Sequence, residues 1–390
     1  MFYKYKKQLK NLIIFFSSFV LKFMTKEKRI LLIPPTKLNG SFGDELMVVS
    51  FIHSNQNTQI DIYTEVDRPD LYHSYSNVNF RGNSNLIHWY KYQQIVVLGA
   101  DNMTGSYGIE RPLKKIKILK TANLFKIDNR ILGFSLKKNS DEKILRELKK
   151  ISGKTGLFLR DIDSFERAKQ EKFKNITLVS DLAFLTPYKD MQDTGYVAWI
   201  NAQREMNKKI VGICPNAIHA NNVGIEQYVE DFIRFIKSVN ESVEVSFVFL
   251  YHDLRSHCQD NSDKDISSIL FDHLHNQVDC YYKDDIGNGI QMKYYVGYTD
   301  LTVTGRMHFG ISGLSLGKPM LGITYEDKFS GLQKLFNIEP EESLIGDYKV
   351  MNEYVDIAIN FIKNSEYYSD KVRDSLGKVK KLSFRNLERV

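Results

Sequence analysis

Short runs rich in β-branched residues alternate with helical stretches from residue 30 onward, and this alternation constrains the fold more than any other feature. Such a pattern is typical of parallel sheets covered by helices. Six candidate strands come first, at residues 30–33, 60–63, 95–98, 130–133, 157–159 and 176–179. After a pause at Thr186-Pro187, four more follow, at residues 210–213, 245–250, 301–304 and 320–323. We therefore expect an α/β protein with two Rossmann-like lobes, residues 30–190 and 191–345.

The remaining tail, residues 346–390, has the periodicity of helices. Val355, Ile359 and Ile362 fall on one helical face, and we expect the tail to pack back on the lobes. Open parallel sheets bind ligands at the carboxyl ends of their strands. Two such sheets predict a site in a central cleft, built from strand-end loops.

The net charge of +7 is concentrated at the start of the chain. Residues 1–29 hold eight Lys and Arg against one Glu, so the rest of the chain is neutral and nucleic-acid binding is disfavoured. Apolar residues recur there at helical spacing, but the run of about ten is half of what a membrane span needs. Two interpretations stay open: a basic amphipathic helix on the anionic inner face of the plasma membrane, or an ordinary helix packed on the first lobe.

Cysteines and common motifs exclude several classes. The three cysteines, Cys214, Cys258 and Cys280, are odd in number and lack C-x-x-C spacing, so we expect no disulfide framework, no metal site and a cytoplasmic location. A P-loop, a complete G-x-G-x-x-G and a G-x-S-x-G elbow are absent from the sequence. One group of histidines is predicted to be solvated and without a role: His252, His257, His273 and His275.

The strongest candidate site is the strand-turn-helix segment 300–317. Gly305 is expected to allow a tight turn, which places Arg306 and His308 at the start of a helix, where N–H groups favour anions. A guanidinium binds carboxylate or phosphate, and an imidazole can transfer a proton near neutral pH. Small residues should let this helix lie close to the sheet: Gly310, Ser312, Gly313 and Ser315.

A second candidate follows the strand at 157–159. Arg160 could supply another cation for a multiply charged ligand, with Asp161 orienting it and Asp163 or Ser164 capping the next helix. Alternatively, Arg160 and its aspartate form a buried structural pair. The residues alone leave both possibilities open.

Two further loops offer groups for a second substrate. In the first loop, Gly40 and Gly43 can bring N–H groups towards a phosphate or sugar, and Asp44 is placed to act as a base. For Glu45, and less strongly for Asp44, stabilisation of the helix start is the favoured explanation. The loop from Gly99 to Gly108 contains Asp101 and Asn102 and suits close substrate approach. Asp181 and Lys328 complete the charged groups near strand ends.

Four segments, taken in order, resemble the polysaccharide pyruvyltransferase family. They are G-x-x-G-D-E at 40–45, R-D-x-x-S at 160–164, S-D-L-A-F at 180–184 and the G-R-M-H to Y-x-x-K run at 305–328. Together they span residues 40–331. Met307 replaces the family's usual leucine, which conserves volume, while Gly99-Ala100-Asp101 replaces a longer glycine run.

The resemblance implies a GT-B-like fold and transfer of pyruvate from phosphoenolpyruvate to two hydroxyls of a sugar, as a cyclic ketal. The acceptor would belong to a cell-surface polysaccharide or exopolysaccharide, or to its lipid-linked precursor. No metal or cofactor is implied beyond phosphoenolpyruvate as co-substrate. The implied catalytic pair is His308 as general acid and Asp44 as base. Implied donor-binding residues are Gly305, Arg306, Met307, Arg160 and Lys328, and implied acceptor-binding residues are Gly40, Gly43, Glu45, Asp101 and Asn102.

Two alternatives stay open at the level of sequence. A GT-B glycosyltransferase would use the same two-lobed cleft to bind the diphosphate of a nucleotide sugar. A membrane-associated scaffold of a polysaccharide assembly complex would retain the fold without catalysis.

Overall fold

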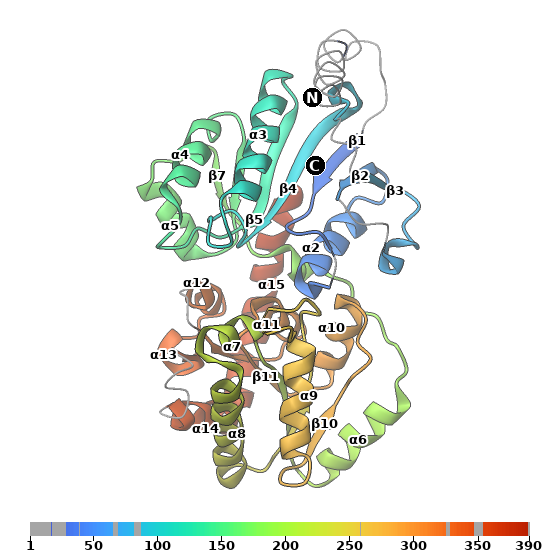
Figure 1. The fold of residues 1–390 in the computed structure, drawn as a ribbon, viewed down its shortest axis with the longest axis vertical. Coiled ribbons are helices and arrows are strands. Elements are labelled where there is room, and N and C mark those ends of the chain that lie inside the picture. The colour runs from blue at the N-terminus through green and yellow to red at the C-terminus, as the bar shows by residue number, and fades with distance from the viewer. Residues whose placement is uncertain are drawn as a thin grey trace.

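The structure, a computed structural model, describes Ser17 and residues 29–38, 40–64, 69–81, 87–257, 259–324, 328–346 and 354–388. Two parallel sheets lie one above the other (Figure 1). The basic segment 1–29, with its two open interpretations as a membrane-surface helix or a helix packed on the first lobe, lies outside the described residues apart from Ser17 and Arg29. Among the described helices, none is long and apolar enough to cross a bilayer.

The first lobe contains a seven-stranded sheet in the order β3-β2-β1-β4-β5-β6-β7, with every neighbouring pair parallel. Its strands are β1 Arg29–Ile33, β2 Gln59–Tyr63, β3 Val78–Arg81, β4 Tyr92–Ala100, β5 Asp128–Phe134, β6 Gly156–Leu159 and β7 Ile176–Leu178. Its helices are α2 Phe42–His53, α3 Glu110–Leu124, α4 Glu142–Ile151 and α5 Ile162–Gln170, and the 3₁₀ turn η3 Leu182–Leu185 follows β7.

The second lobe repeats this order in a six-stranded parallel sheet, β10-β9-β8-β11-β12-β13. Its strands are β8 Lys209–Cys214, β9 Val245–Phe249, β10 Cys280–Tyr282, β11 Leu301–Thr304, β12 Met320–Ile323 and β13 Leu344–Ile345. The helices that follow the first lobe are α6 Thr194–Glu205, α7 Ala217–Val223, α8 Ile225–Ser242, α9 Asp263–Leu274, α10 Gly289–Gly297, α11 Met307–Leu314, α12 Lys328–Lys334, α13 Pro340–Ser343, α14 Val355–Lys363 and α15 Ser365–Phe384.

The two predicted sheets are confirmed, and all ten predicted strands are present within a few residues. The strands that the sequence did not predict are β3, β10 and β13. Each pairs with one neighbour at an edge of its sheet and is two to four residues long. Such short edge strands bury little surface, so they carry neither a long apolar run nor a clear alternation.

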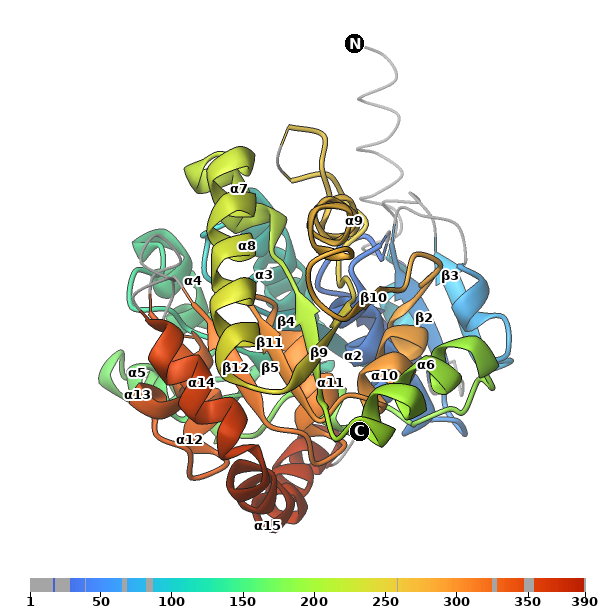
Figure 2. The same cartoon turned by 90° about the horizontal axis from the view of Figure 1, so that it is seen from below.

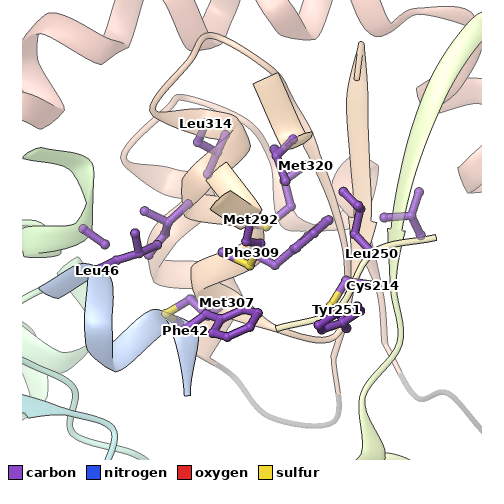
Figure 3. Packing of buried hydrophobic residues seen from close by; sticks show 14 of the residues in the cluster. Phe42, Leu46, Cys214, Leu250, Tyr251, Met292, Met307, Phe309, Leu314 and Met320 are labelled. Atoms are coloured by element: carbon purple, nitrogen blue, oxygen red, sulfur yellow. The ribbon is translucent and has the colours of Figure 1, made fainter. Parts of the chain in front are cut away.

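Helix α2 joins the two lobes. Every residue from Phe42 to Ile52 is buried, which explains why the helix is apolar on all sides. Its Phe42 lies near Met307 and Tyr251 of the second lobe (Figure 3), and Phe42 and Leu46 belong to one hydrophobic core that continues through both lobes. The ring centroids of Phe42 and Tyr251 are 6.0 Å apart.

The described part of the C-terminal tail is helical, as predicted. Helix α14 packs alongside α8 (Figure 2), and α15 then returns to the first lobe. There Ser383 Oγ donates to the carbonyl of Asp181 at 2.7 Å, and Asn386 Nδ2 donates to the carbonyl of Ser180 at 2.9 Å. The end of the chain thus anchors the segment that comes after β7.

Candidate active site

A cavity of about 360 Å³ lies between the lobes, at the carboxyl ends of both sheets. In each sheet, successive strands are added first on one side of the first strand and then on its other side. The change of side falls between β1 and β4 in the first lobe and between β8 and β11 in the second. Loops after all four of these strands line the cavity, as the switch-point rule for open sheets predicts. The lining residues from these loops are Thr36, Ser41, Asp44, Asp101, Asn102, Tyr107, Asn216, Ile218, Arg306, Met307 and His308.

His308 reaches across the cleft to residues of the first lobe. Its Nε2 lies 3.3 Å from Asp181 Oδ2 and 3.5 Å from a terminal guanidinium nitrogen of Arg160. Burial alone would raise the pKa of Asp181, but His308 and Arg160 outweigh it and hold that pKa below its ordinary value. Asp181 therefore stays ionised and fixes the imidazole at the cavity wall.

Arg160 is held by the same carboxylate. Its Nε donates to Ser135 Oγ at 2.8 Å, and one terminal nitrogen donates to Asp181 Oδ2 at 2.7 Å. The other terminal nitrogen has no hydrogen bond to the described residues, and Arg160 lines the cavity. The sequence left a ligand-binding cation and a buried structural pair as alternatives for Arg160. The side chain forms a buried ion pair and also presents a terminal N–H group to the cavity.

Asp161 acts on Arg160 through Ser135, whose Oγ accepts from Arg160 Nε at 2.8 Å and donates to Asp161 Oδ2 at 2.9 Å. Asp161 is also the N-cap of α5, where it accepts from the backbone N–H of Ser164 at 2.7 Å. Asp163, one of the predicted caps, instead pairs with Lys334 at 2.9 Å. The N-cap geometry explains the correction, because the first aspartate after β6 meets the orphan N–H groups of the helix.

Arg306 is the N-cap residue of α11, so it stands at the start of the helix as predicted. Its Nε and one terminal nitrogen donate to the two oxygens of Asp263 at 2.8 and 2.6 Å. Its second terminal nitrogen has no hydrogen bond to the described residues, and the side chain lines the cavity. Asp263 thus fixes the guanidinium plane and leaves one edge for a ligand.

Gly305 has a different role from the predicted one. Its backbone is not in the left-handed region, so no special turn conformation requires glycine there. A Cβ at this position would lie 3.0 Å from Asn216 Cβ and 3.1 Å from His219 Cε1. Gly305 therefore permits close packing and does not line the cavity. The predicted close approach of α11 to its sheet is confirmed, since a Cβ on Gly310 would lie 1.9 Å from Met320 Sδ.

Asp44 and Glu45 are adjacent in α2 but face different surroundings. Asp44 lines the cavity and accepts a hydrogen bond from Thr36 Oγ1. Burial raises its pKa, while Thr36 and the charge of Arg255 oppose that shift. Glu45 does not line the cavity; its Oε2 accepts from the N–H of Gly289, the first residue of α10. This contact supports the helix-capping interpretation of Glu45. The helix that it caps is α10, whereas Glu45 itself belongs to α2.

Glu45→Gln is expected to change how stability depends on pH. Burial raises the pKa of Glu45 to about 8, from 4.5. The folded state keeps a proton that the unfolded chain releases, so unfolding free energy falls as pH rises from about 4.5 to about 8. Glutamine cannot ionise and still accepts from Gly289. From about pH 5 to about pH 8.5, the unfolding free energy of the variant should rise relative to that of the wild type by on the order of 1 kcal/mol or more. Thermal unfolding of both proteins at the two pH values measures this difference. A difference that is constant with pH would contradict this assignment.

Gly43 allows α2 to approach two histidines. A Cβ at Gly43 would lie 2.3 Å from His308 Nδ1 and 2.6 Å from His252 Nε2. The two imidazole rings are parallel, with an interplanar angle of 3° and centroids 6.0 Å apart. Gly43 therefore contributes by leaving space for His308 and does not itself line the cavity.

Gly43→Ala is expected to lower turnover at least about tenfold, because the methyl group displaces the His308 ring and small misplacements of reacting groups are costly. Gly377→Ala is the matched control. A Cβ at Gly377, in α15, would meet nothing within 4 Å, and alanine is the better helix former by about 1 kcal/mol. The control should melt at a higher temperature with unchanged turnover. Equal activity of the two variants would contradict the role of Gly43.

The prediction that His252 lies in a solvated region is wrong, and His257 is only partly exposed. His252 is 5% exposed, and both histidines line the cavity. Burial lowers the pKa of His252 well below its ordinary value, helped by the charge of Arg306, so the ring is neutral. His257 Nε2 lies 3.0 Å from Asp253 Oδ2, which also binds Arg255 at 2.6 Å. Strand β9 ends at Phe249, shortly before His252. This strand-end position in the sequence could have indicated that His252 lies in the cleft.

The other predicted site residues differ in whether they reach the cavity. Asp101 and Asn102 line it, and Asp101 accepts from Tyr107 at 3.2 Å. Met307 lines the cavity and packs in the core between the lobes. Gly40 has a φ of 103°, and its carbonyl accepts from Leu254 N–H at 2.9 Å, so it joins the two lobes and does not line the cavity. Helix α12 begins at Lys328, whose side chain lies outside the described structure.

Three charged side chains at or beside the cavity were not among the predicted catalytic and binding residues: Asp181, Asp263 and Arg255. Asp181 belongs to a recognised motif segment, so a signal existed. Asp263 follows the N-cap Ser262 of α9, and nothing in the spacing of the sequence pairs it with Arg306. Within the described ranges, no group of three or more His, Cys, Asp or Glu side chains is arranged to hold a metal ion.

Solved structures with similar folds define the class of protein. The UDP-GlcNAc 2-epimerase from Neisseria meningitidis, bound to UDP-GlcNAc, matches with a TM-score of 0.61 and 12% identity over 93% of this chain and 98% of that chain. Phytolacca americana UGT2, complexed with UDP-2fluoro-glucose and pterostilbene, matches with a TM-score of 0.56 and 9% identity over 93% and 98%. Both are GT-B folds, and at this identity they show the fold alone. The predicted GT-B-like architecture is confirmed.

The family is defined by sequence. Residues 42–327 match the family described as polysaccharide pyruvyl transferase. The chain therefore belongs to the polysaccharide pyruvyl transferase family, and the predicted resemblance is confirmed. No curated protein matches the chain.

Proposed function

We propose that this protein transfers pyruvate from phosphoenolpyruvate to two hydroxyls of a sugar, forming a cyclic ketal. The observation that carries the proposal is the pair of arginines, Arg160 and Arg306, one from each lobe, which line one cavity together with His308. Each is fixed by a buried aspartate and keeps one terminal nitrogen for a ligand. A donor with a carboxylate and a phosphate needs two such cationic subsites.

His308 and Asp44, which line the same cavity, supply the proton transfers. Asp44, with a pKa raised by burial, accepts the proton of the first sugar hydroxyl as its oxygen bonds to C2 of phosphoenolpyruvate. His308 donates a proton to the methylene carbon, which becomes the methyl group. The second hydroxyl then bonds to C2 and gives its proton to His308, while the C2–O bond to phosphate breaks and the departing phosphate takes the proton held by Asp44. One diol and one phosphoenolpyruvate give one ketal and one inorganic phosphate.

The product test is mass spectrometry of candidate acceptor glycans after incubation with phosphoenolpyruvate. The expected product gains the mass of pyruvic acid less one water, together with release of one inorganic phosphate per adduct. Calorimetry with phosphoenolpyruvate against UDP-, GDP- and CMP-sugars tests the nucleotide-sugar alternative. Binding of a nucleotide sugar in place of phosphoenolpyruvate would overturn the proposal, and a lack of binding by any of these anions would favour the scaffold alternative.

The acceptor polymer and its attachment point are part of the same proposal. We propose a sugar of a cell-surface polysaccharide, exopolysaccharide or lipid-linked precursor, modified in the cytoplasm. Asp101 and Asn102 lie on the first-lobe side of the cavity beside Asp44, where the acceptor would bind. Their hydrogen-bonding side chains suit sugar hydroxyls.

A further inference from the structure

A second cavity, of about 250 Å³, opens beside the active site and is not used by the chemistry described above. Thr36 and Arg111 line both cavities, so the two are neighbours in space. Its apolar lining includes Ile33, Pro35 and Ile118. None of its described lining residues is acidic. We call this space the basic cavity.

The cations of the basic cavity come mainly from one face of α3. Arg111, Lys114 and Lys115 are separated by three and four residues, so their side chains lie on the same side of the helix. Like charges at this spacing destabilise a helix. Among the described residues, no carboxylate forms an ion pair with any of the three. Lys114 Nζ also lies 5.7 Å from the centre of the Tyr63 ring, and a bound anion would relieve the repulsion among the three cations.

Lys115 gives an independent indication of anion binding. The residue is 8% exposed, and its Nζ donates to the carbonyl of Pro35 at 2.9 Å. Burial lowers the pKa of Lys115 to about 8; the charge of Asp44 opposes this shift, and that of Arg111 adds to it. A buried ammonium is normally paired with a carboxylate in contact. Here a backbone carbonyl is its hydrogen-bond acceptor, and the cation borders a cavity large enough for a ligand.

We propose that the basic cavity binds a phosphate or diphosphate group on the reducing end of the acceptor sugar. This inference rests on the proposed pyruvyl transfer. Thr36 connects the two spaces, because it lines both cavities and donates to Asp44. A saccharide with its hydroxyls at Asp44 can therefore place its anionic end against Arg111 and Lys114. The apolar lining then contacts the group attached to the far side of the phosphate, either a lipid or a nucleoside.

The test is calorimetry with inorganic pyrophosphate, farnesyl diphosphate, farnesol and uridine diphosphate, in the absence and presence of saturating phosphoenolpyruvate. Pyrophosphate should still bind when phosphoenolpyruvate saturates the active site. Arg111→Gln and Lys114→Gln should each weaken pyrophosphate binding about fivefold to tenfold, as expected for loss of a charge-assisted hydrogen bond. Lys114 lines the basic cavity alone, so Lys114→Gln should change phosphoenolpyruvate binding less than about twofold.

Two matched variants serve as controls. Lys117→Gln removes an exposed charge from the same helix, outside the basic cavity, and should leave pyrophosphate binding unchanged. Arg160→Lys should weaken phosphoenolpyruvate binding and spare pyrophosphate. Tighter binding of farnesyl diphosphate than of pyrophosphate, with no binding of farnesol, would identify a lipid-linked acceptor, and tighter binding of uridine diphosphate would identify a nucleotide-linked one.

Two results would overturn the inference. One is a single pyrophosphate site that phosphoenolpyruvate empties; the other is unchanged pyrophosphate affinity in both α3 variants. If phosphoenolpyruvate bound to none of the proteins, the proposed function would be refuted instead. That result comes from the phosphoenolpyruvate titration, whereas the inference is tested by the pyrophosphate titration.

Discussion

His308→Ala is expected to abolish pyruvyl transfer while leaving the fold intact. The imidazole is the proposed proton donor, and general acid catalysis contributes about 10² to 10⁴ in rate. Because Arg160 and Arg306 keep their aspartate partners, phosphoenolpyruvate should still bind to the variant. Turnover is followed by phosphate release in the presence of an acceptor, and the donor dissociation constant is measured by calorimetry.

The matched control is His273→Ala. His273 is exposed on α9 and lies outside the cavity, so its removal should leave turnover unchanged. Circular dichroism and melting curves check that both variants are folded. Turnover of a folded His308→Ala protein within about tenfold of the wild type would rule out the catalytic role of this residue.

Asp181→Asn is expected to have the second-largest effect, on both stability and donor binding. The substitution keeps the shape of the side chain but removes the charge shared by Arg160 and His308. Leaving one partner of a buried ion pair uncompensated costs about 3–5 kcal/mol. Without the carboxylate, the imidazole loses its charged partner and the guanidinium keeps only its hydrogen bond to Ser135 among the described residues. The kcat/KM for phosphoenolpyruvate should therefore fall at least about a hundredfold.

Asp61→Asn separates the catalytic effect from the loss of stability. Asp61 is a fully buried carboxylate in β2 that binds Arg29, Arg81 and Tyr92 at 2.9 to 3.1 Å, outside the cavity. Its replacement should also destabilise the fold, with little change in KM for phosphoenolpyruvate at a temperature where both variants are folded. If Asp181→Asn changed only stability, Asp181 would be a structural residue.

The sequence predicted the lobes and the main strand ends because both depend on local pattern. Strand β4 shows why: Val96 and Leu98 face the core shared by the lobes, while Ile95 and Val97 face a second core under the α3 and α4 helices. A strand buried on both faces gives a continuous apolar run that is readable from sequence. The positions of Arg306 and His308 follow from the boundary between β11 and α11, which is also local.

The partners of the charged groups could not be predicted, because they depend on contacts between distant segments. Arg160 has an aspartate next to it in sequence, yet it pairs with Asp181, since Asp161 is taken by the helix cap. Arg306 pairs with Asp263, which comes from a different strand-end loop. His252 was misassigned because clustering with exposed histidines suggested solvent, whereas its place after β9 puts it in the cleft.

The return of α15 to the first lobe sets the order in which the active site can be completed during protein synthesis. Ser383 and Asn386 bind the carbonyls of Asp181 and Ser180 across 202 and 206 residues of chain. When both sheets have left the ribosome, Ser383 and Asn386 have still to emerge, and they anchor the segment that contains Asp181, the partner of His308. Shortened chains that lack 383–386 should therefore fold into two lobes and bind donor weakly, because the segment that carries Asp181 loses these two anchors.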